Sequence, residues 1–183
     1  MADFARLFEK RPAPGAFSCW CTYHHRVVPE PLAKGPIPRA RELKKRQRMR
    51  QELVEKERSH GILVYSEGEP VGWCQYGTKD ELPRIDRDRG YQKSVSSGDS
   101  RRLWRITCFV ADTRHRRRGV ASAALKAALS AIRRRGGGLV EAYPISTWGA
   151  YREYYGTVSM FRKEGFRVVS SYGKNNLVMR RVI

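Results

Sequence analysis

Residues 112–122 form a basic turn whose spacing best predicts chemistry. Within this turn, Arg116, Gly119 and Ala121 give the pattern Arg-x-x-Gly-x-Ala just ahead of a helix-forming stretch. A glycine lets the backbone approach a ligand closely, while the free N–H groups and the dipole of a helix N-terminus favour an anion such as a pyrophosphate. Three arginines beside those amides, Arg116, Arg117 and Arg118, would add charge-assisted donors. The alternative interpretation is an ordinary basic helix start on a solvated surface.

The turn is predicted to lie between a strand and a helix, with a second strand after the helix. Residues 106–111 are β-branched and aromatic, as in a short buried strand. The helix has one apolar stripe, formed by Ala121, Leu125, Ala128, Leu129 and Ile132. Glycines 136–138 end the helix, and residues 139–143 form the next strand. This is a βαβ unit, so we expect parallel strands and a right-handed crossover.

The chain from Gly61 to its end, about two-thirds of the sequence, resembles the GCN5-related N-acetyltransferase (GNAT) family. The cofactor signature of that family is Gln/Arg-x-x-Gly-x-Gly/Ala, which the turn matches. Residues 159–166 resemble the last helix of the family and the Gly-Phe that follows it, and residues 61–77 resemble its central hairpin. The resemblance implies an α/β (α+β) fold over a single domain, residues 1–183. Its mixed central sheet would have six to seven strands flanked by helices, with a V-shaped splay between the two central parallel strands.

The same resemblance implies acetyl-CoA (coenzyme A) as cofactor and a primary amine as acetyl acceptor. The pantetheine would run along the strand at residues 106–111, where a bulge would open a slot beside the neighbouring strand. The strand-to-turn segment is one residue longer than the usual pattern, so individual backbone roles stay open by one position. The residues implied in cofactor binding are Phe109, Val110, Ala111, Arg116, Arg117, Arg118, Gly119, Val120, Ala121 and Phe161.

Glu141 is the candidate base for acetyl transfer. A lysine-like amine has a pKa of about 10.4 and is almost wholly protonated near neutrality, so a base would help it attack. By the resemblance, Glu141 lies on the strand that lines the other side of the slot. The alternative for this residue is an ion pair with one of the many arginines. Glu67 and Glu69 on the predicted hairpin turn are weaker candidates.

The candidate acids lie in an aromatic segment before the last helix. In the family, a tyrosine of the last helix often protonates the departing thiolate, but Phe161 stands at that place here and has no hydroxyl group. Tyr154 or Tyr155 would substitute, or water would. A thiol with a pKa of about 8.5 can also leave unaided. The aromatic segment could equally cover the edge of the core.

The chain is strongly basic, with a net charge of +19 and a pI near 10.4. Such a charge concentrates polyanions, and both coenzyme A and nucleic acids qualify. Residues 39–59 predict a helix with a thin apolar stripe and a mostly basic face. Two further functions follow, a nucleic-acid-binding module that has lost the chemistry and an acetyltransferase with an RNA- or ribosome-associated acceptor. Charge alone specifies little, so a nucleic-acid partner is not the favoured interpretation.

The remaining segments complete the domain. Residues 1–16 read as a loose lead-in, and residues 17–28 as a first strand anchored by Trp20. Residues 62–65 and 71–76 predict a hairpin, and glycines within it suggest bulging or close approach of a ligand. Residues 78–102 contain few apolar side chains and predict a long, lid-like loop. After a last helix capped by Thr157, residues 166–170 and 177–182 predict an antiparallel pair.

The cysteines favour burial over metal binding. Cys19, Cys21, His24 and His25 raise the idea of zinc, but the other two cysteines stand singly in apolar strand patterns. We therefore expect no metal and small buried thiols in a reducing compartment. No apolar run reaches the length of a membrane span and the N-terminus lacks a signal-peptide pattern, so we expect a cytoplasmic protein without a membrane partner.

Overall fold

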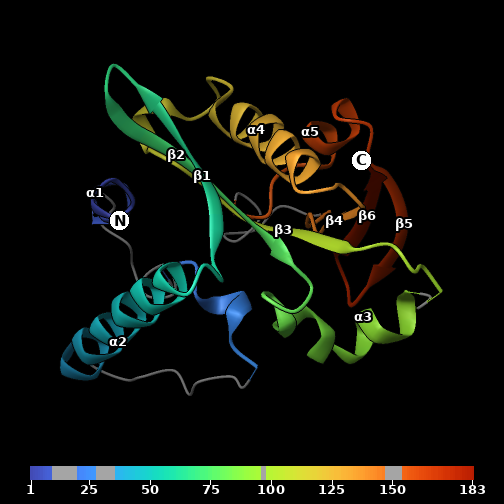
Figure 1. Ribbon diagram of the computed structural model, residues 1–183, viewed down its shortest axis with the longest axis horizontal. Coiled ribbons are helices and arrows are strands. Elements are labelled where there is room, and N and C mark those ends of the chain that lie inside the picture. The colour runs from blue at the N-terminus through green and yellow to red at the C-terminus, as the bar shows by residue number, and fades with distance from the viewer. Residues whose placement is uncertain (10–19, 28–35, 96–97, 147–153) are drawn as a thin grey trace.

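A computed structural model describes residues 1–9, 20–27, 36–95, 98–146 and 154–183. Its centre is one mixed sheet in the order β1-β2-β3-β4-β6-β5 (Figure 1). The strands are β1 (His60–Ser66), β2 (Glu69–Thr78), β3 (Leu103–Ala111), β4 (Leu139–Ala142), β5 (Arg167–Tyr172) and β6 (Asn176–Val182). Strands β3 and β4 are parallel, and every other neighbouring pair is antiparallel. The predicted fold class and the predicted parallel pair are confirmed.

Helices cover both faces of this sheet. They are α1 (Ala2–Glu9), α2 (Pro36–Glu55), α3 (Arg89–Ser94), α4 (Val120–Arg134) and α5 (Val158–Lys163), with short 3-10 helices η2 (Tyr23–His25), η3 (Pro83–Arg87) and η4 (Thr113–His115). Figure 1 shows α4 and α5 on one side of the sheet and α1, α2 and α3 on the other. The main apolar core lies under α4 and α5, and two smaller apolar clusters lie under α1 and α3.

A bulge in β3 re-aims its side chains. Gln75 of β2 is opposite Cys108 and the next residue, Tyr76, is opposite Ile106, which leaves Thr107 without a counterpart. Because the extra residue reverses the alternation, Ile106 and Phe109 both enter the core under α4 although they are three residues apart. The bulge lies on the strand where the sequence predicts it.

The two central parallel strands separate after four residue pairs. Residues 103–106 of β3 pair with residues 139–142 of β4. Beyond Ala142 the chain stays with β6, because Leu177 N–H donates to the carbonyl of Pro144 at 3.0 Å and Ile145 bridges to Asn176. Within the described residues, the last part of β3, residues 107–111, therefore has no β4 partner. The predicted splay is confirmed.

Several other local predictions hold. The hairpin is β1 and β2, the basic helix is α2, and the closing antiparallel pair is β5 and β6. The hydroxyl of Thr157 accepts the N–H of Met160 at 3.2 Å and caps α5 as expected. A close approach does occur at Gly72, since a Cβ there would lie 2.2 Å from the Val120 side chain. The group that approaches is the first residue of α4.

The prediction for the N-terminal region is wrong in its described parts. Residues 2–9 form a helix because Phe4 and Leu7 lie on one face and bury almost completely. The described part of residues 17–28 does not form the predicted strand. Trp20 and Cys21 have positive φ values of 49° and 50°, and the short helix η2 follows them. Trp20 is nevertheless an anchor, with its ring 5.7 Å from that of Phe4. Residues 10–19 and 28 lie outside the described part of the chain.

The prediction of a long loop at residues 78–102 is also wrong. Helices η3 and α3 occupy its middle, and the carboxylate of Asp88 caps α3 by accepting the N–H groups of Gly90 and Tyr91. The few apolar side chains are placed where they bury, with Ile85 and Tyr91 each 6% exposed. The segment is a docked layer on the sheet. Residues 96–97 lie outside the described chain.

Candidate functional site

The basic turn leads into α4 through a left-handed glycine. Gly119 has φ 82° and is the N-cap of the helix, whose first hydrogen bond runs from Ala123 N–H to its carbonyl at 2.9 Å. The N–H groups of residues 120–122 therefore have no acceptor inside the helix. A Cβ added to Gly119 would meet nothing within 4 Å, so the space beside these donors is open. Such a helix end binds anions.

A buried aspartate holds the turn in place. Asp112 is 6% exposed, and its carboxylate accepts the N–H of Arg114 at 2.9 Å and its guanidinium at 3.0 Å. The hydrogen bond from Arg114 lowers the pKa of Asp112 to about 2. Its own N–H donates to Val71 on β2 at 2.8 Å. The sequence analysis missed this role, although an aspartate directly after a strand and two residues before a basic turn is a readable capping signal.

The predicted cofactor residues divide into exposed cations and buried strand residues. Arg116, Arg117 and Arg118 are exposed around the helix end. Phe109 and Val110 bury their side chains in the two apolar clusters on opposite faces of the sheet, so only their backbone faces the splay. Ala111, Val120 and Ala121 are partly exposed between these two groups. The turn and the open edge of β3 thus form one continuous surface, which is the arrangement that an extended anionic ligand requires.

Phe161 lies in the core. Its side chain is fully buried, and its ring contacts those of Phe109 and Phe166 at centroid distances of 5.9 and 5.2 Å. The role that the resemblance implies for it in cofactor binding stays a prediction. Its observed contacts join α5 to β3.

Glu141 is buried in a network of polar groups. Its carboxylate accepts the hydroxyls of Tyr91 at 2.7 Å and Tyr143 at 2.6 Å, and it pairs with Arg180 at 2.7 Å. Burial, followed by the charge of this carboxylate, raises the pKa of Tyr91 to about 12. Four acceptor positions thus meet at least three donors, and Glu141 is 0% exposed. Of the two interpretations that the sequence left open, these contacts match the ion pair.

Tyr154 and Tyr155 lie beside the open part of β3. Tyr154 packs against the apolar cluster that contains Val110, and the ring of Tyr155 is 6.1 Å from that of His24. Gly156 brings this segment close to the strand, since a Cβ there would lie 3.1 Å from the Phe109 ring. The remaining aromatic residues of the segment, Trp148 and Tyr151, lie outside the described chain.

A buried polar chain extends from the β3 bulge, and the sequence analysis did not find it. Thr107 donates to the side-chain carbonyl of Gln75 at 3.0 Å, and the Gln75 amide lies 2.9 Å from His25 Nε2. His25 Nδ1 lies 2.7 Å from the carbonyl oxygen of Glu81, so Nδ1 carries the proton and Nε2 accepts. Burial lowers the pKa of His25 to about 4 and keeps the ring neutral. No pattern in the sequence brings these residues together.

The cysteines that the structure describes are buried free thiols, as expected. They are Cys21, Cys74 and Cys108, and the sulfur atoms of Cys21 and Cys108 are 3.4 Å apart. Burial raises the pKa of the Cys74 thiol well above its usual value. Among the described residues, no group of three His, Cys, Asp or Glu side chains could hold a metal ion. Cys19 lies outside this part of the chain.

The structure thus combines a mixed sheet whose central parallel strands splay apart with a basic turn at a helix N-terminus. The model of the acetyltransferase (GNAT) family matches residues 24–156. The chain belongs to this family and is an acetyltransferase, as the resemblance implied.

Solved structures confirm the fold. The chain is similar to ribosomal-protein-alanine N-acetyltransferase from Brucella melitensis, at 14% identity and TM-score 0.55 over 100% of this chain and 95% of that one. An acetyltransferase from Thermus thermophilus is 17% identical, with TM-score 0.52 over 100% of this chain and 90% of that one. An N-acetyltransferase from Staphylococcus aureus is 12% identical, with TM-score 0.51 over 76% of each chain. Such identities establish the fold alone.

No curated protein matches the chain significantly. Among the helices of the described residues, none combines the length and apolar character that a bilayer crossing requires.

Proposed function

We propose that the protein is an acetyl-CoA-dependent N-acetyltransferase that transfers the acetyl group to a primary amine by direct attack on the thioester. The observation that carries this proposal is the continuity between the open edge of β3 and the left-handed Gly119 at the start of α4. A ligand with an extended arm and a diphosphate matches this surface in both shape and charge. The thioester supplies an activated acyl group once it is bound.

The residues present suit that cofactor. The N–H groups of residues 120–122 and the side chains of Arg116, Arg117 and Arg118 would hold the diphosphate. The free backbone groups of residues 109–111 would align the pantetheine and offer one N–H donor to the thioester oxygen. Because the side chains of Phe109 and Val110 are buried in opposite clusters, this edge of β3 is rigid. Alignment therefore needs little reorganisation.

Proton transfers are assigned from the contacts. Tyr154 and Tyr155, brought close to Phe109 by Gly156, are the proposed donors to the departing thiolate. Glu141 is paired in register with Arg105 in the part of β4 before the strands separate, so we propose that its engaged carboxylate holds this strand in position and does not act as the base. The amine would then react through its neutral fraction, so the rate should rise with pH toward the pKa of the acceptor.

Gly119→Trp tests the cofactor site directly. The indole would occupy the open space beside the free N–H groups of α4, so acetyl-CoA should bind at least about tenfold more weakly, or ~1.4 kcal/mol. Isothermal titration of the purified protein with acetyl-CoA measures this loss.

Gly136→Trp is the matched control. Gly136 also has a positive φ, 93°, with nothing within 4 Å of an added Cβ, but it lies at the other end of α4. This variant carries the same backbone strain and should bind acetyl-CoA as the parent does. If Gly119→Trp also retains the parent affinity, the diphosphate does not bind at this turn.

The acceptor is best identified by an amine panel that reads released coenzyme A thiol. The panel should contain peptides with free α-amines, lysine peptides, polyamines and aminoglycosides. The Brucella melitensis protein is named for acting on an alanine of a ribosomal protein, so a peptide with an alanine α-amine belongs in it. Saturable thiol release with one class names the acceptor, and release with none of them contradicts the proposed reaction.

A further inference from the structure

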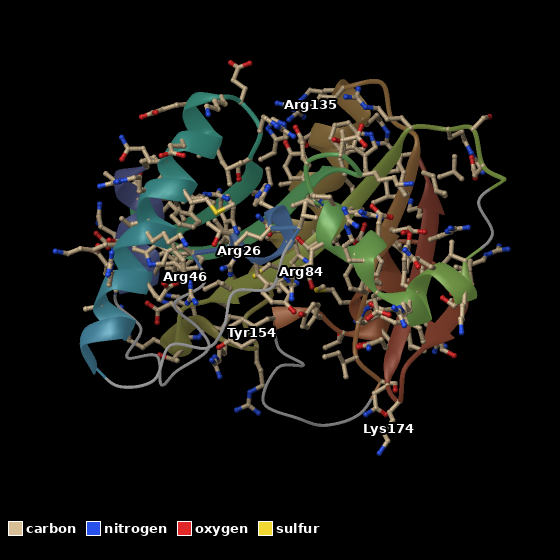
Figure 2. The ribbon with its side chains drawn as sticks, turned by 90° about the horizontal axis from the view of Figure 1, so that it is seen from below. Arg26, Arg46, Arg84, Arg135, Tyr154 and Lys174 are labelled. Carbon is tan, nitrogen blue, oxygen red and sulfur yellow. The ribbon has the colours of Figure 1, made fainter. Side chains whose placement is uncertain are left out.

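Six exposed arginines gather at the C-terminal end of α4, remote from the proposed cofactor turn. They come from three segments and are Arg58, Arg101, Arg102, Arg133, Arg134 and Arg135. We call this surface the arginine pole. Figure 2 shows its Arg135 at one edge of the molecule, well separated from Tyr154. An α-helix rises 1.5 Å per residue, so the 15 residues of α4 place the pole about 22 Å from Gly119.

Direct contacts join the three segments. A guanidinium nitrogen of Arg135 lies 3.0 Å from His60 Nε2, two residues after Arg58. On the other side, Leu139 N–H donates to the carbonyl of Arg102 at 2.9 Å. Gly138 makes this approach close, since a Cβ there would lie 2.3 Å from the same carbonyl oxygen. The three segments that carry the six arginines therefore meet at one end of the molecule.

The pole carries more positive charge than the fold requires. The C-terminal dipole of a helix amounts to about half a negative charge, which one cation offsets. Of the nearby carboxylates, Asp99 pairs with Arg101 at 2.8 Å and Glu81 with His60 at 3.0 Å, while Glu57 is exposed. Arg133, Arg134 and Arg135 are consecutive, so their like charges repel. A polyanion bound at the pole would relieve this repulsion.

The chemistry of the pole selects the kind of polyanion. The pole presents six guanidinium groups. A guanidinium binds phosphate through two parallel hydrogen bonds and stacks on flat rings, neither of which an ammonium does. One of the six already lies over an aromatic ring, with Arg102 4.8 Å from the Trp104 centroid. Stacking on unpaired bases is a feature of RNA recognition.

We propose that the arginine pole binds the phosphate backbone of single-stranded RNA. The pole consists of a helix end and two turns and presents neither a helix face nor a β-ribbon to a major groove, so it does not read duplex DNA by sequence. The contact with RNA would bring an RNA-bound acceptor to the enzyme, or the enzyme to RNA. Acetyl transfer itself can proceed without this contact. The inference is therefore independent of the proposed reaction.

The test replaces the three consecutive arginines by glutamine, which keeps helix propensity and removes three charges. The probe is a fluorescent single-stranded RNA of about 20 nucleotides, longer than one typical site, titrated at several salt concentrations. If each arginine meets one phosphate, R133Q/R134Q/R135Q should bind about 50-fold more weakly at 0.15 M salt, and the slope of log affinity against log salt should fall by about 2. Affinity equal to that of the parent overturns the proposal.

The basic face of α2 supplies the matched control. Arg41, Lys44 and Arg48 are exposed at spacings of three and seven residues and lie on one helix face. R41Q/K44Q/R48Q changes the net charge by the same amount and should retain RNA affinity within about twofold. An equal loss in both variants would mean that total charge attracts RNA and would contradict a defined pole.

Two further measurements make the outcome specific. Duplex DNA of matched length should bind the parent more weakly than the RNA, and equal binding would contradict the choice of RNA. Photo-crosslinking of the unmodified protein to 4-thiouridine RNA should label peptides that contain residues 99–104 and 133–139, and labels confined elsewhere would overturn the site. Acetyl-CoA affinity of R133Q/R134Q/R135Q should equal that of the parent, which separates this proposal from the proposed function.

Discussion

Buried charge across the parallel pair is the main feature at the scale of single residues. Arg105 of β3 and Glu141 of β4 are opposite each other in register, and each is 0% exposed. Their side chains do not pair with one another. Arg105 pairs with Asp86 at 2.6 Å, Glu141 pairs with Arg180 at 2.7 Å, and Tyr91 stands between them with its hydroxyl 2.7 Å from the glutamate. Burying two charges is tolerable only because each has its own partner.

Glu141→Gln tests whether this carboxylate is structural or catalytic. Removing the charge leaves Arg180 unpaired, so we expect the free energy of unfolding to fall by about 3 kcal/mol, measured by urea denaturation. In the folded enzyme, the pH profile of acetyl transfer should keep the parent shape. Glu69→Gln, at a carboxylate that is 48% exposed and paired with Arg6, should change stability by less than about 0.5 kcal/mol. A transfer rate that drops at neutral pH and recovers as pH rises would instead make Glu141 the base.

At the scale of elements, helices η3 and α3 show why a polar segment can still be ordered. Residues 78–102 contain few apolar side chains. However, the guanidinium of Arg105 donates to the carbonyl of Leu82 at 2.7 Å and to the carboxylate of Asp86 at 2.6 and 2.9 Å. Such bonds join segments that are distant in sequence. Hydrophobic periodicity cannot detect them, and for this reason the sequence predicts a loop at residues 78–102.

Tyr91→Phe tests how α3 is attached to the sheet. The variant keeps the ring but removes the hydroxyl that donates to Glu141, so the free energy of unfolding should fall by about 1–3 kcal/mol. Amide hydrogens of residues 84–94 should exchange faster, because α3 loses its polar contact with β4. Hydrogen exchange by mass spectrometry measures both the site and the size of this effect. Tyr65→Phe is the control, since its hydroxyl donates to Asp3 at an exposed position, and it should leave the protection of α3 unchanged. If Tyr91→Phe also protects α3 as the parent does, the assignment is wrong.

The same contrast explains which parts of the fold were predictable. The unit β3-α4-β4 follows from local patterns, because an apolar strand, a stripe along a helix and left-handed glycines are each visible in the sequence. The attachment of α2 does not follow from such patterns, since among its residues 40–55 the one buried side chain is an arginine. Arg50 is 2% exposed and stacks over Phe4 at 4.6 Å and Trp73 at 4.8 Å. No periodicity marks a cation as a core residue. The turn at Gly119 was readable because its chemistry is local, whereas the Glu141 network joins three elements.

At the scale of the whole molecule, positive charge is distributed over two ends of α4 and the face of α2. The net charge of +19 therefore acts on the few ionisable groups that lie inside. His24 is 8% exposed, and its buried Nδ1 has no hydrogen-bond partner among the residues that the structure describes. Burial first, and then the charges of His25, Arg84 and Arg105, lower its pKa to about 3. His25 beside it has a pKa of about 4, lowered by burial and by Arg50.

These two imidazoles make the protein sensitive to acid. Each has an ordinary pKa of 6.5 that folding lowers, to about 3 for His24 and about 4 for His25, so between these limits the unfolded chain binds protons that the folded chain does not. The free energy of unfolding should therefore fall as pH decreases from about 6.5 to 4.5, by up to about 1.4 kcal/mol per pH unit for each imidazole.

Urea denaturation at half-unit steps between pH 6.5 and 4.5 measures this slope. The range lies above the pH at which Asp99 and Asp112 take up protons in the folded chain, because hydrogen bonds from Arg101 and Arg114 lower the pKa of each aspartate to about 2. His24→Leu removes one buried imidazole and should remove about half of the part of the slope that the two imidazoles contribute. If the slope of His24→Leu equals that of the parent, His24 takes up its proton at the same pH in the folded and unfolded chains. The description of His24 as a buried neutral ring near the charges of Arg84 and Arg105 would then be wrong.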